Sequence, residues 1–395
     1  MLMKLRLLAE SEPQGKKVLL RADFNVPLHR GQVADDFRIR AALPTIRWLV
    51  ERGAKVAICS HLGRPKGKVV PELSLAPVAR RLGELLDKEV PLIRDCVGDP
   101  VEEAVAGLPP GGVVLLENVR FHPGEEANDP EFARELAAPF ELYVNDAFGT
   151  AHRAHASTTG VTHYLPAYAG LLLAREVEVL CGITENPRRP YYVVVGGKKI
   201  KDKLGVLTDL LPQVDGFLIG GGVAFTFLVA QGKQVGDSIV DRELVPTIRD
   251  LIQQATQQGK ELHLPQDVVA ARELGEEVET KVFPAGAIPE GWLGLDIGPA
   301  TQAAFAEVLS GAGTVVWAGP MGAFEYTPFA RGTEAIARAL ADSEAFTVVG
   351  GGETGEAVVK LGLEDKFSHL STGGGATLAF LRREPMPALE ALRVE

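Results

Sequence analysis

The chain has few cysteines and no long apolar run. Its three cysteines, Cys59, Cys96 and Cys181, are far apart, odd in number and surrounded by apolar residues. This pattern gives neither a disulfide framework nor a metal knuckle, and it is typical of a reducing compartment. The N-terminus reaches acidic residues too early for a secretory signal, and no apolar stretch approaches the ~20 residues of a membrane span. We therefore expect a cytoplasmic protein that does not bind membranes.

An excess of basic residues is also missing. The chain has 41 Lys and Arg against 52 Asp and Glu, a net charge of −11. This balance argues against general binding to nucleic acid, so a local cluster of cations must hold any anionic ligand. No lysine precedes a serine or threonine, so there is no Walker A motif, and the H-R-D and D-F-G motifs of protein kinases are absent. Any nucleotide site is of another kind.

Glycine, in contrast, is abundant, at 43 of 395 residues, against a usual ~7%. Both halves of the chain alternate strands with helices, and the second half has expected strands at 191–195, 216–220, 261–264, 314–319 and 346–351. This length and alternation predict two doubly wound, parallel-sheet, Rossmann-like α/β domains. We place the first at 1–169 and the second at 191–375, with an interdomain cleft. Residues 170–186 read as one connector helix without a strand before it, and the connector ends at 190.

The stretch 193-VVVGGKKIKDKLGVL-207 predicts a buried strand, a glycine turn and a helix start. Backbone N–H groups and the positive end of the helix dipole bind phosphate at such junctions. The four lysines Lys198, Lys199, Lys201 and Lys203 would oppose that dipole unless an anion is bound there. The alternative interpretation is a solvated, lysine-rich turn.

In the first half, cations and polar side chains follow the strands. They are Asp23, Asn25, His61, Arg64, Arg120, His122, His152, Arg153 and His155, and Arg38 begins the first helix. Loops after parallel strands share one sheet edge, and arginine suits carboxylate and phosphate. The pattern predicts a site for a small, highly anionic ligand, although each arginine alone could be solvated or ion-paired. No third soft ligand is near His152 and His155, so we expect no metal there.

In the second half, glycines replace the arginines at the strand-to-helix junctions. They occur at 196–197, 220–222, 319–322, 350–352 and 373–375. Such junctions suit a polyphosphate and a flat base lying against the backbone, although glycines also simply make tight turns. Together the two halves predict phosphoryl transfer between a nucleotide and a small acid.

At these residues the sequence resembles the phosphoglycerate kinases. The similar stretches include 18-VLLRADFNVPL-28, 60-SHLGRPKG-67, 115-LLENVRFHPGEEAND-129, 144-VNDAFGTAHRAHAST-158, 196-GGKKIKDK-203, 317-WAGPMGAFE-325 and 350-GGGETGEAVVKLG-362. The resemblance implies a monomer with two doubly wound domains, whose tail, about 376–395, packs back on the first domain. It also implies reversible transfer between 1,3-bisphosphoglycerate and ADP, which gives 3-phosphoglycerate and MgATP.

The resemblance also implies site residues. The 3-phosphoglycerate site would be Asp23, Phe24, Asn25, Arg38, His61, Leu62, Gly63, Arg64, Arg120 and Arg153. The nucleotide site would be Gly197, Lys199, Lys203, Gly221, Gly222, Gly294, Pro320, Glu325, Gly351, Gly352, Glu353 and Thr354. Glu325 would hold the ribose and Glu353 would reach Mg²⁺. Arg38, Lys203 and the glycine-rich helix start at Gly374 would serve catalysis.

Four residues depart from the family pattern, all in the nucleotide half. Lys198 stands where the family usually has Ala, Ala300 where it has Lys, Ala318 where it has Asn, and Glu353 where it has Asp. Glutamate still ligates Mg²⁺. One alternative is therefore a non-catalytic 3-phosphoglycerate-binding relic with an impaired nucleotide site. Another is a kinase that acts on a different acid. The complete set of arginine and histidine residues at the 3-phosphoglycerate site argues against it.

Overall fold

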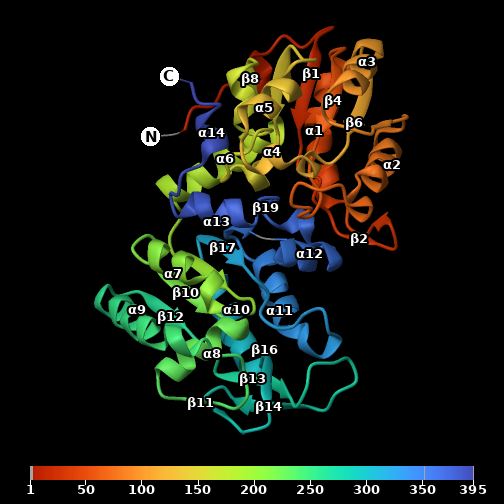
Figure 1. The fold of residues 1–395 in the computed structure, drawn as a ribbon. Helices are drawn as coiled ribbons and strands as arrows, with labels where there is room; N and C mark the ends of the chain where they lie inside the picture. Colours follow the sequence, from red (N-terminus) through yellow and green to blue (C-terminus); the bar gives the residue numbers. More distant parts are fainter. Residues whose placement is uncertain (1–2, 351, 395) are drawn as a thin grey trace. The chain divides into compact units, whose positions relative to one another are not determined.

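A computed structural model describes residues 3–350 and 352–394 (Figure 1). The chain forms two compact units, which we treat separately. The first runs to Cys181 and also includes the residues from Arg383 onward. The second runs from Gly182 to Arg382.

The first unit is built on a parallel six-stranded sheet with the order β5-β6-β4-β1-β7-β8. Four of the five residues of β1 are fully buried, as expected for a central strand covered on both faces. The strands are β1 (Lys17–Arg21), β4 (Lys55–Cys59), β5 (Leu92–Ile93), β6 (Val113–Leu116), β7 (Leu142–Asn145) and β8 (Ala167–Ala169), with a small hairpin of β2 (Leu28–His29) and β3 (Gln32–Val33).

Helices between these strands carry the chain back across the sheet. α5 begins where capping chemistry predicts, because the Asp129 side chain accepts a hydrogen bond of 2.9 Å from the Phe132 N–H and Pro130 occupies the first position. The α-helices are α1 (Phe37–Glu51), α2 (Ala76–Leu86), α3 (Asp99–Gly107), α4 (Pro123–Glu126), α5 (Pro130–Ala137), α6 (Leu171–Glu185) and α14 (Pro387–Glu390). The 3₁₀ turns are η1 (Leu8–Glu10), η2 (Pro71–Leu73), η3 (Val119–Phe121), η4 (Phe148–Thr150) and η5 (Gly160–His163).

The C-terminal segment belongs to the first unit. The Arg6 N–H donates to the Leu392 carbonyl and the Val394 N–H donates to the Lys4 carbonyl, both at 2.9 Å. Leu389 and Leu392 are buried. The boundary between the units falls inside α6, between Cys181 and Gly182.

The expectation that α6 has no strand before it is wrong. β8 precedes it directly and pairs in parallel with β7. Two of the three residues of β8 are alanines, so this short edge strand lacks the β-branched run that marks the other strands.

The second unit is built on another parallel sheet, with the order β12-β10-β9-β17-β18-β19. Numbered along this unit, the order is 3-2-1-4-5-6, that of the doubly wound nucleotide-binding folds, so the switch point lies between β9 and β17. The strands are β9 (Tyr191–Val195), β10 (Gly216–Ile219), β12 (Glu261–His263), β17 (Thr314–Ala318), β18 (Phe346–Gly350) and β19 (His369–Ser371). These two sheets confirm the expected Rossmann-like α/β fold class.

The helices of this unit are α7 (Leu204–Leu210), α8 (Gly221–Ala230), α9 (Val245–Gln257), α10 (Pro299–Ser310), α11 (Arg331–Ala341), α12 (Gly352–Lys360) and α13 (Gly375–Leu381), with 3₁₀ turns η6 (Ile200–Asp202), η7 (Arg242–Leu244), η8 (Thr327–Phe329) and η9 (Glu364–Lys366). An antiparallel sheet of β13 (Asp267–Ala271), β14 (Thr280–Pro284) and β16 (Leu293–Ile297) was not expected. The pair β11 (Gln234–Val235) and β15 (Ala287–Ile288) was not expected either.

The expected strand, glycine turn and helix start all occur within 193–207, but the helix begins only after the lysines. α7 begins only at Leu204, after η6, so Lys203 is the residue before the helix and the other three lysines lie further upstream. Gly197 has φ of +100°, a conformation that favours glycine. A bend at Gly197 and the 3₁₀ turn η6 separate β9 from α7.

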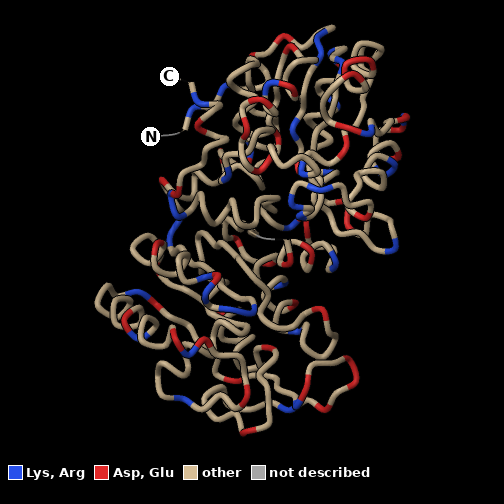
Figure 2. Tube along the Cα trace, in the orientation of Figure 1, with Lys and Arg blue, Asp and Glu red and all other residues tan. Residues whose placement is uncertain are grey.

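Figure 2 shows basic and acidic residues interspersed along the trace of each unit. The net charge of −11 is therefore not the product of one acidic block. None of the helices in the described part of the chain has the length and apolar character needed to cross a membrane.

Candidate functional site

The polar residues predicted in the first unit gather at the carboxyl ends of its strands. The segment after β1 carries Asp23 and Asn25, and the segment after β4 carries His61 and Gly63. The Gly63 N–H donates to Asn25 Oδ1 at 2.8 Å, and Arg120 Nη1 donates to the Gly63 carbonyl at 2.9 Å. These bonds join the loops after β1, β4 and β6. Loops that follow neighbouring strands of a parallel sheet lie at one edge and can form one site.

Arg38, in the first turn of α1, joins this group. Its Nη1 lies 3.0 Å from Asp23 Oδ2 and 3.3 Å from the Asn25 carbonyl oxygen. The Arg38 side chain is 22% exposed, whereas that of Asp23 is 7% exposed, so the guanidinium is anchored on a buried carboxylate and remains accessible. An accessible, oriented guanidinium suits an anionic ligand.

The electrostatics of the first-unit cluster favour a carboxylate and a neutral imidazole. Burial acts to raise the pKa of Asp23, but Arg38, His61 and Arg21 more than offset it, and the pKa falls below 3.8. Burial lowers the pKa of His61 well below 6.5, against the pull of Asp23. The cations that remain charged in this cluster are therefore its arginines.

Arg120 is the most informative residue of this group. Its side chain is 3% exposed, and its Nε lies 3.4 Å from Glu126 Oε1. Within the described part of the chain, neither Nε nor Nη2 has a hydrogen-bond partner. Burial lowers the pKa of Arg120, and the nearby Arg21 and Arg153 lower it further against Glu126. Buried donors without partners are costly, and an anion at this position would satisfy them.

The other predicted residues of this half take different places. Phe24 and Leu62 are buried; the Phe24 N–H donates to Ser60 Oγ at 2.8 Å, and the Leu62 carbonyl accepts a 2.7 Å hydrogen bond from Asn118 Nδ2. Arg64 is exposed in the segment after β4, and Arg153 is half-buried with its Nε 3.3 Å from His152 Nε2. His155 is buried with its Nδ1 3.7 Å from Glu125 Oε1, and burial lowers its pKa to about 4. His122 pairs with Asp95 instead of joining the arginines.

The second unit contains a cavity of about 510 Å³ at the carboxyl ends of its strands. Its lining comes from the segments after β9, β10, β17 and β18, which surround the switch point of the sheet, and from β16 and the segments after β11 and β13. Seventeen residues line it: Gly197, Lys198, Gly221, Gly222, Ile239, Leu274, Leu293, Gly294, Leu295, Pro320, Gly322, Ala323, Phe324, Glu325, Glu353, Glu356 and Lys360.

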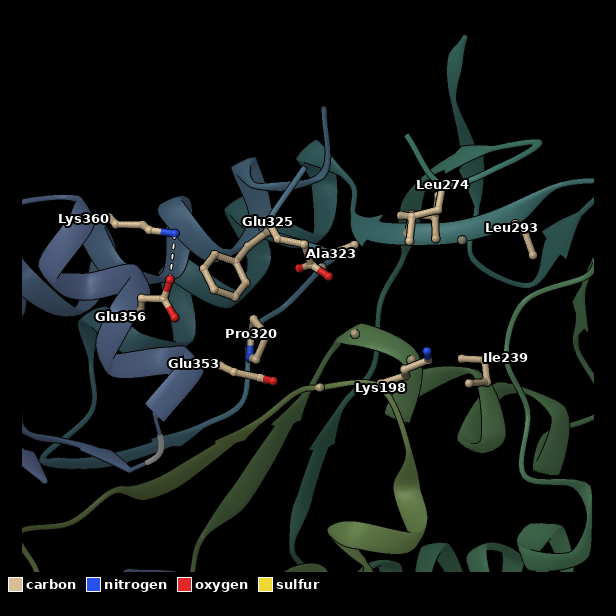
Figure 3. A pocket seen from close by; sticks show the side chains of 17 residues that line it. Lys198, Ile239, Leu274, Leu293, Pro320, Ala323, Glu325, Glu353, Glu356 and Lys360 are labelled. Carbon is tan, nitrogen blue, oxygen red and sulfur yellow. Dashed lines mark ion pairs between the residues drawn. The ribbon is translucent and has the colours of Figure 1, made fainter. Parts of the chain in front are cut away.

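The two ends of this cavity differ in character (Figure 3). Ile239, Leu274 and Leu293 lie together at one end. Toward the other end lie Glu353 and an ion pair in which Lys360 Nζ is 2.8 Å from Glu356 Oε1. An apolar end beside glycine backbone suits a flat base, and the polar end suits the phosphates.

Most of the predicted nucleotide residues line this cavity: Gly197, Gly221, Gly222, Gly294, Pro320, Glu325 and Glu353. Lys199, Lys203, Gly352, Thr354 and Gly374 do not, and Gly351 lies outside the described residues. Thr354 is buried and its Oγ accepts a 2.8 Å hydrogen bond from the Gly319 N–H, which fixes the turn before Pro320. Gly374, at φ of +44°, directly precedes α13.

Lys203 lies beside the cavity rather than in its wall. A Cβ built on Gly197 would be 3.9 Å from Lys203 Cε. Burial lowers the pKa of Lys203, and Glu353 opposes that shift. The ammonium group is therefore within electrostatic range of the carboxylate at the polar end of the cavity.

Sequence reasoning missed the apolar wall of the cavity. Ile239, Leu274, Leu293 and Leu295 come from separate segments that the sequence did not bring together, two of them from the unexpected strand β16. Glu356 and Lys360 carried a weak signal, since their four-residue spacing is that of an ion pair on a helix. Of the four departures, Lys198 and Glu353 line the cavity, while Ala300 and Ala318 do not.

The close fit of the glycines leads to a prediction. A Cβ on Gly222 would lie 2.3 Å from the Lys198 carbonyl oxygen and 2.8 Å from Ile239 Cγ2. Gly222→Ala must therefore displace the cavity wall, and we expect the KM for the nucleotide to rise about tenfold or more, with the KM of the second substrate little changed. Steady-state kinetics against each substrate would show this. Gly355→Ala, where a Cβ meets nothing within 4 Å, is the control; equal nucleotide KM values for Gly222→Ala and wild type would contradict the assignment.

A buried carboxyl group next to Gly322 of the cavity wall leads to a prediction on stability. Burial raises the pKa of Asp296 from 3.8 to about 7, although the Gly332 and Ile297 N–H groups donate to its oxygens at 2.7 and 2.9 Å. A carboxyl group whose pKa is higher in the folded than in the unfolded protein contributes to the free energy of unfolding at pH values below its unfolded pKa. That contribution is lost as the pH rises through the folded pKa. We expect the free energy of unfolding of wild type, relative to Asp296→Asn, to fall between about pH 4 and pH 7.

Denaturant unfolding at several pH values measures this difference. Asp250→Asn, at an exposed position on α9, is the control and should show no such fall. A wild-type-minus-Asp296→Asn difference that stays flat, or rises, across this range would contradict the assignment.

Fold and site together define a class of protein: an α/β phosphotransferase with a glycine-lined cavity in one unit and a cluster of arginines in the other. The family model described as "Phosphoglycerate kinase" matches residues 8–384. The chain belongs to the phosphoglycerate kinase family, and it is a kinase acting on phosphoglycerate with a nucleotide.

Individual relatives agree with this family. The chain is 54% identical to "Phosphoglycerate kinase" of Moorella thermoacetica over 385 residues, 98% of each chain. It is 52% identical to "Phosphoglycerate kinase, cytosolic" of Triticum aestivum over 390 residues, 98% of this chain and 97% of the relative. Among solved structures, phosphoglycerate kinase from Coxiella burnetii matches with a TM-score of 0.85 at 43% identity, and that from Pyrococcus horikoshii with 0.90 at 33%, each covering 98% of both chains. These relatives give no support to the non-catalytic alternative.

Proposed function

We propose that each unit binds one substrate of the reversible transfer between 1,3-bisphosphoglycerate and ADP, which gives 3-phosphoglycerate and MgATP. The observation that carries the proposal for the first unit is Arg120, whose buried Nε and Nη2 have no hydrogen-bond partner among the described residues. Arg38, held 3.0 Å from Asp23, and the exposed Arg64 complete a set of cations for a small ligand with a carboxylate and a phosphate.

In the second unit, the cavity of about 510 Å³ holds the nucleotide. The base lies at the end formed by Ile239, Leu274 and Leu293, against the glycine backbone at Gly221 and Gly222. Glu325 reaches the ribose hydroxyls, and Gly197 lies along the phosphates. Lys203 supplies positive charge next to them, whereas Lys198 lies beside Ile239 at the end of the base.

Magnesium enters with the nucleotide. Glu353 fits it, because its carboxylate is a hard oxygen donor, is exposed in the first turn of α12, and lines the polar end of the cavity. One protein carboxylate is enough, since Mg²⁺ keeps several waters and uses phosphate oxygens as its other ligands. When bound, the ion neutralises phosphate charge.

The chemistry needs no general base. The acceptor in the ATP-consuming direction is the carboxylate of 3-phosphoglycerate, which is ionised at pH 7. What the chain must supply is in-line placement of the reactants and neutralisation of charge on the transferring phosphoryl group. Arg38 supplies a cation from the first unit, and Lys203 supplies one from the second, with the backbone N–H groups that begin α13 after Gly374.

Calorimetry of two variants tests the assignment of one substrate to each unit. Arg64→Ala removes an exposed cation of the first unit and should weaken 3-phosphoglycerate binding about fivefold or more, about 1 kcal/mol, while MgADP binding stays within twofold. Glu325→Ala should weaken MgADP binding about fivefold or more, while 3-phosphoglycerate binding stays within twofold. Either variant weakening both ligands equally, or only the other ligand, would contradict the assignment.

Three further properties complete the proposal. We place the enzyme in the cytosol, as the name of the wheat relative states for that protein. We expect a monomer, which sedimentation equilibrium would test. Because the two substrates bind to separate units, the reaction requires movement of 1–169 and 191–375 about the 170–190 connector; small-angle scattering with and without both substrates would detect it.

A further inference from the structure

We propose that Asp95, Cys96 and His122 form a binding site for a divalent cation of the zinc class, separate from the magnesium position at Glu353. One ligand atom of each residue, a carboxylate oxygen, a thiol sulfur and an imidazole nitrogen, lies within 4.8 Å of the other two. Nothing in the proposed transfer reaction uses these three side chains.

The topology of the first unit brings these residues together. Asp95 and Cys96 lie just after β5, and His122 lies after β6 and η3. β5 and β6 are parallel neighbours, so the segments that leave them share one edge of the sheet. Cysteine spacing predicted no metal knuckle, because residues 96 and 122 are far apart in sequence and only the strand pairing makes them neighbours.

Contacts around the cluster hold the side chains in place. The imidazole of His122 stacks on the Phe132 ring with a centroid distance of 4.9 Å and an interplanar angle of 21°. His122 Nε2 lies 2.8 Å from Asp95 Oδ1, which also accepts a 2.7 Å hydrogen bond from the Cys96 N–H. Oriented ligands lose little freedom on binding a metal ion, which raises affinity.

The cluster has one buried ligand and two ligands that solvent can reach. Cys96 is 1% exposed, whereas the side chains of His122 and Asp95 are 32% and 44% exposed. A cation can therefore approach from solvent, bind the thiolate below it and keep water as a fourth ligand. Sulfur, nitrogen and one carboxylate are the ligands of tetrahedral Zn²⁺, whereas Mg²⁺ requires oxygen ligands, so the donor set selects the former.

The test is a titration of chelator-treated, nucleotide-free protein with Zn²⁺, followed by calorimetry, and with Co²⁺, followed by absorption. Wild type should bind one Zn²⁺ per chain, and Co²⁺ should produce a near-ultraviolet thiolate-to-metal band. Cys96→Ser should abolish that band, and both Cys96→Ser and His122→Gln should weaken Zn²⁺ binding about tenfold or more. Circular dichroism checks that each variant is folded; should Cys96→Ser not fold, the surface variants His122→Gln and Asp95→Asn decide.

Three control variants separate this site from other sources of binding. Cys181→Ser and His29→Gln remove another cysteine and an exposed histidine, and Glu353→Gln alters the magnesium position; each should leave Zn²⁺ affinity within twofold of wild type. Absence of one-to-one binding, or binding that survives both Cys96→Ser and His122→Gln, would overturn the proposal. Loss of binding in Glu353→Gln alone would place the cation in the nucleotide cavity and would also overturn it.

Discussion

Lys203→Ala should lower kcat by about two to three orders of magnitude, with KM values changed only modestly. The reason is the position of the ammonium group. Lys203 lies next to Gly197 of the cavity wall and within electrostatic range of Glu353, and its burial lowers its pKa. A cation in such a place interacts most strongly with charge that develops on the transferring group, so its loss raises the barrier more than it weakens ground-state binding.

Steady-state kinetics of Lys203→Ala and Lys201→Ala would show whether position matters. Lys201 carries the same charge two residues earlier but is exposed, so its variant should retain kcat within about threefold of wild type. A Lys203→Ala enzyme whose kcat also stays within about threefold would show that the assigned role is wrong.

Arg38→Ala should have an effect of similar size, a fall in kcat of about a hundredfold or more. Its guanidinium is anchored by the 3.0 Å ion pair with Asp23 and still accessible at 22% exposure. The variant loses a planar donor group and leaves the buried Asp23 carboxylate without its main cation. Arg38→Lys should recover only part of the activity, because an ammonium cannot make the bidentate contacts of a guanidinium.

Arg40→Ala is the matched control for Arg38. Arg40 lies on the same helix, but its side chain is 46% exposed and pairs with Asp36 at 2.8 Å. Kinetic constants within threefold of wild type are expected for this variant. Comparable losses in both variants would mean that the effect comes from destabilised α1 rather than from the site; thermal unfolding of both proteins would check this.

The sequence was a good guide wherever local chemistry decides the structure. Residues Val193 to Val195 were predicted to form a buried strand, and they do. The loops after strands could be assigned to one sheet edge because a parallel sheet forces that arrangement. The bond that the Gly63 N–H donates to Asn25 Oδ1 and the bond that Arg120 donates to the Gly63 carbonyl follow from that rule.

The sequence was a poor guide where tertiary pairing decides. The β8 sequence, Ala-Tyr-Ala, has a low propensity for strand formation. It forms a strand because it pairs with β7, which would otherwise be at the edge of the sheet. β14 is largely exposed and pairs with β13 across a loop that carries no clear turn signal. The apolar end of the cavity depends partly on this antiparallel sheet, so Leu293 and Leu295 could not be assigned to a site in advance.

The four residues that depart from the family pattern differ in whether they lie in the cavity wall. Lys198 adds a cation to the cavity wall, and Glu353 places a carboxylate at its polar end. Ala318 is fully buried at the end of β17, and Ala300 lies at the start of α10, outside the cavity lining. The cavity therefore retains glycine backbone, an apolar end and a carboxylate at its polar end despite the four differences.

The proposed function is tested most directly by a coupled steady-state assay of the wild-type enzyme with 3-phosphoglycerate and MgATP, run beside calorimetric binding of each ligand. We expect binding of both ligands and turnover on the order of tens per second or more, an ordinary rate for kinases. Binding of 3-phosphoglycerate without MgATP binding and without turnover would contradict it, and would show that the nucleotide cavity of this chain has lost its function.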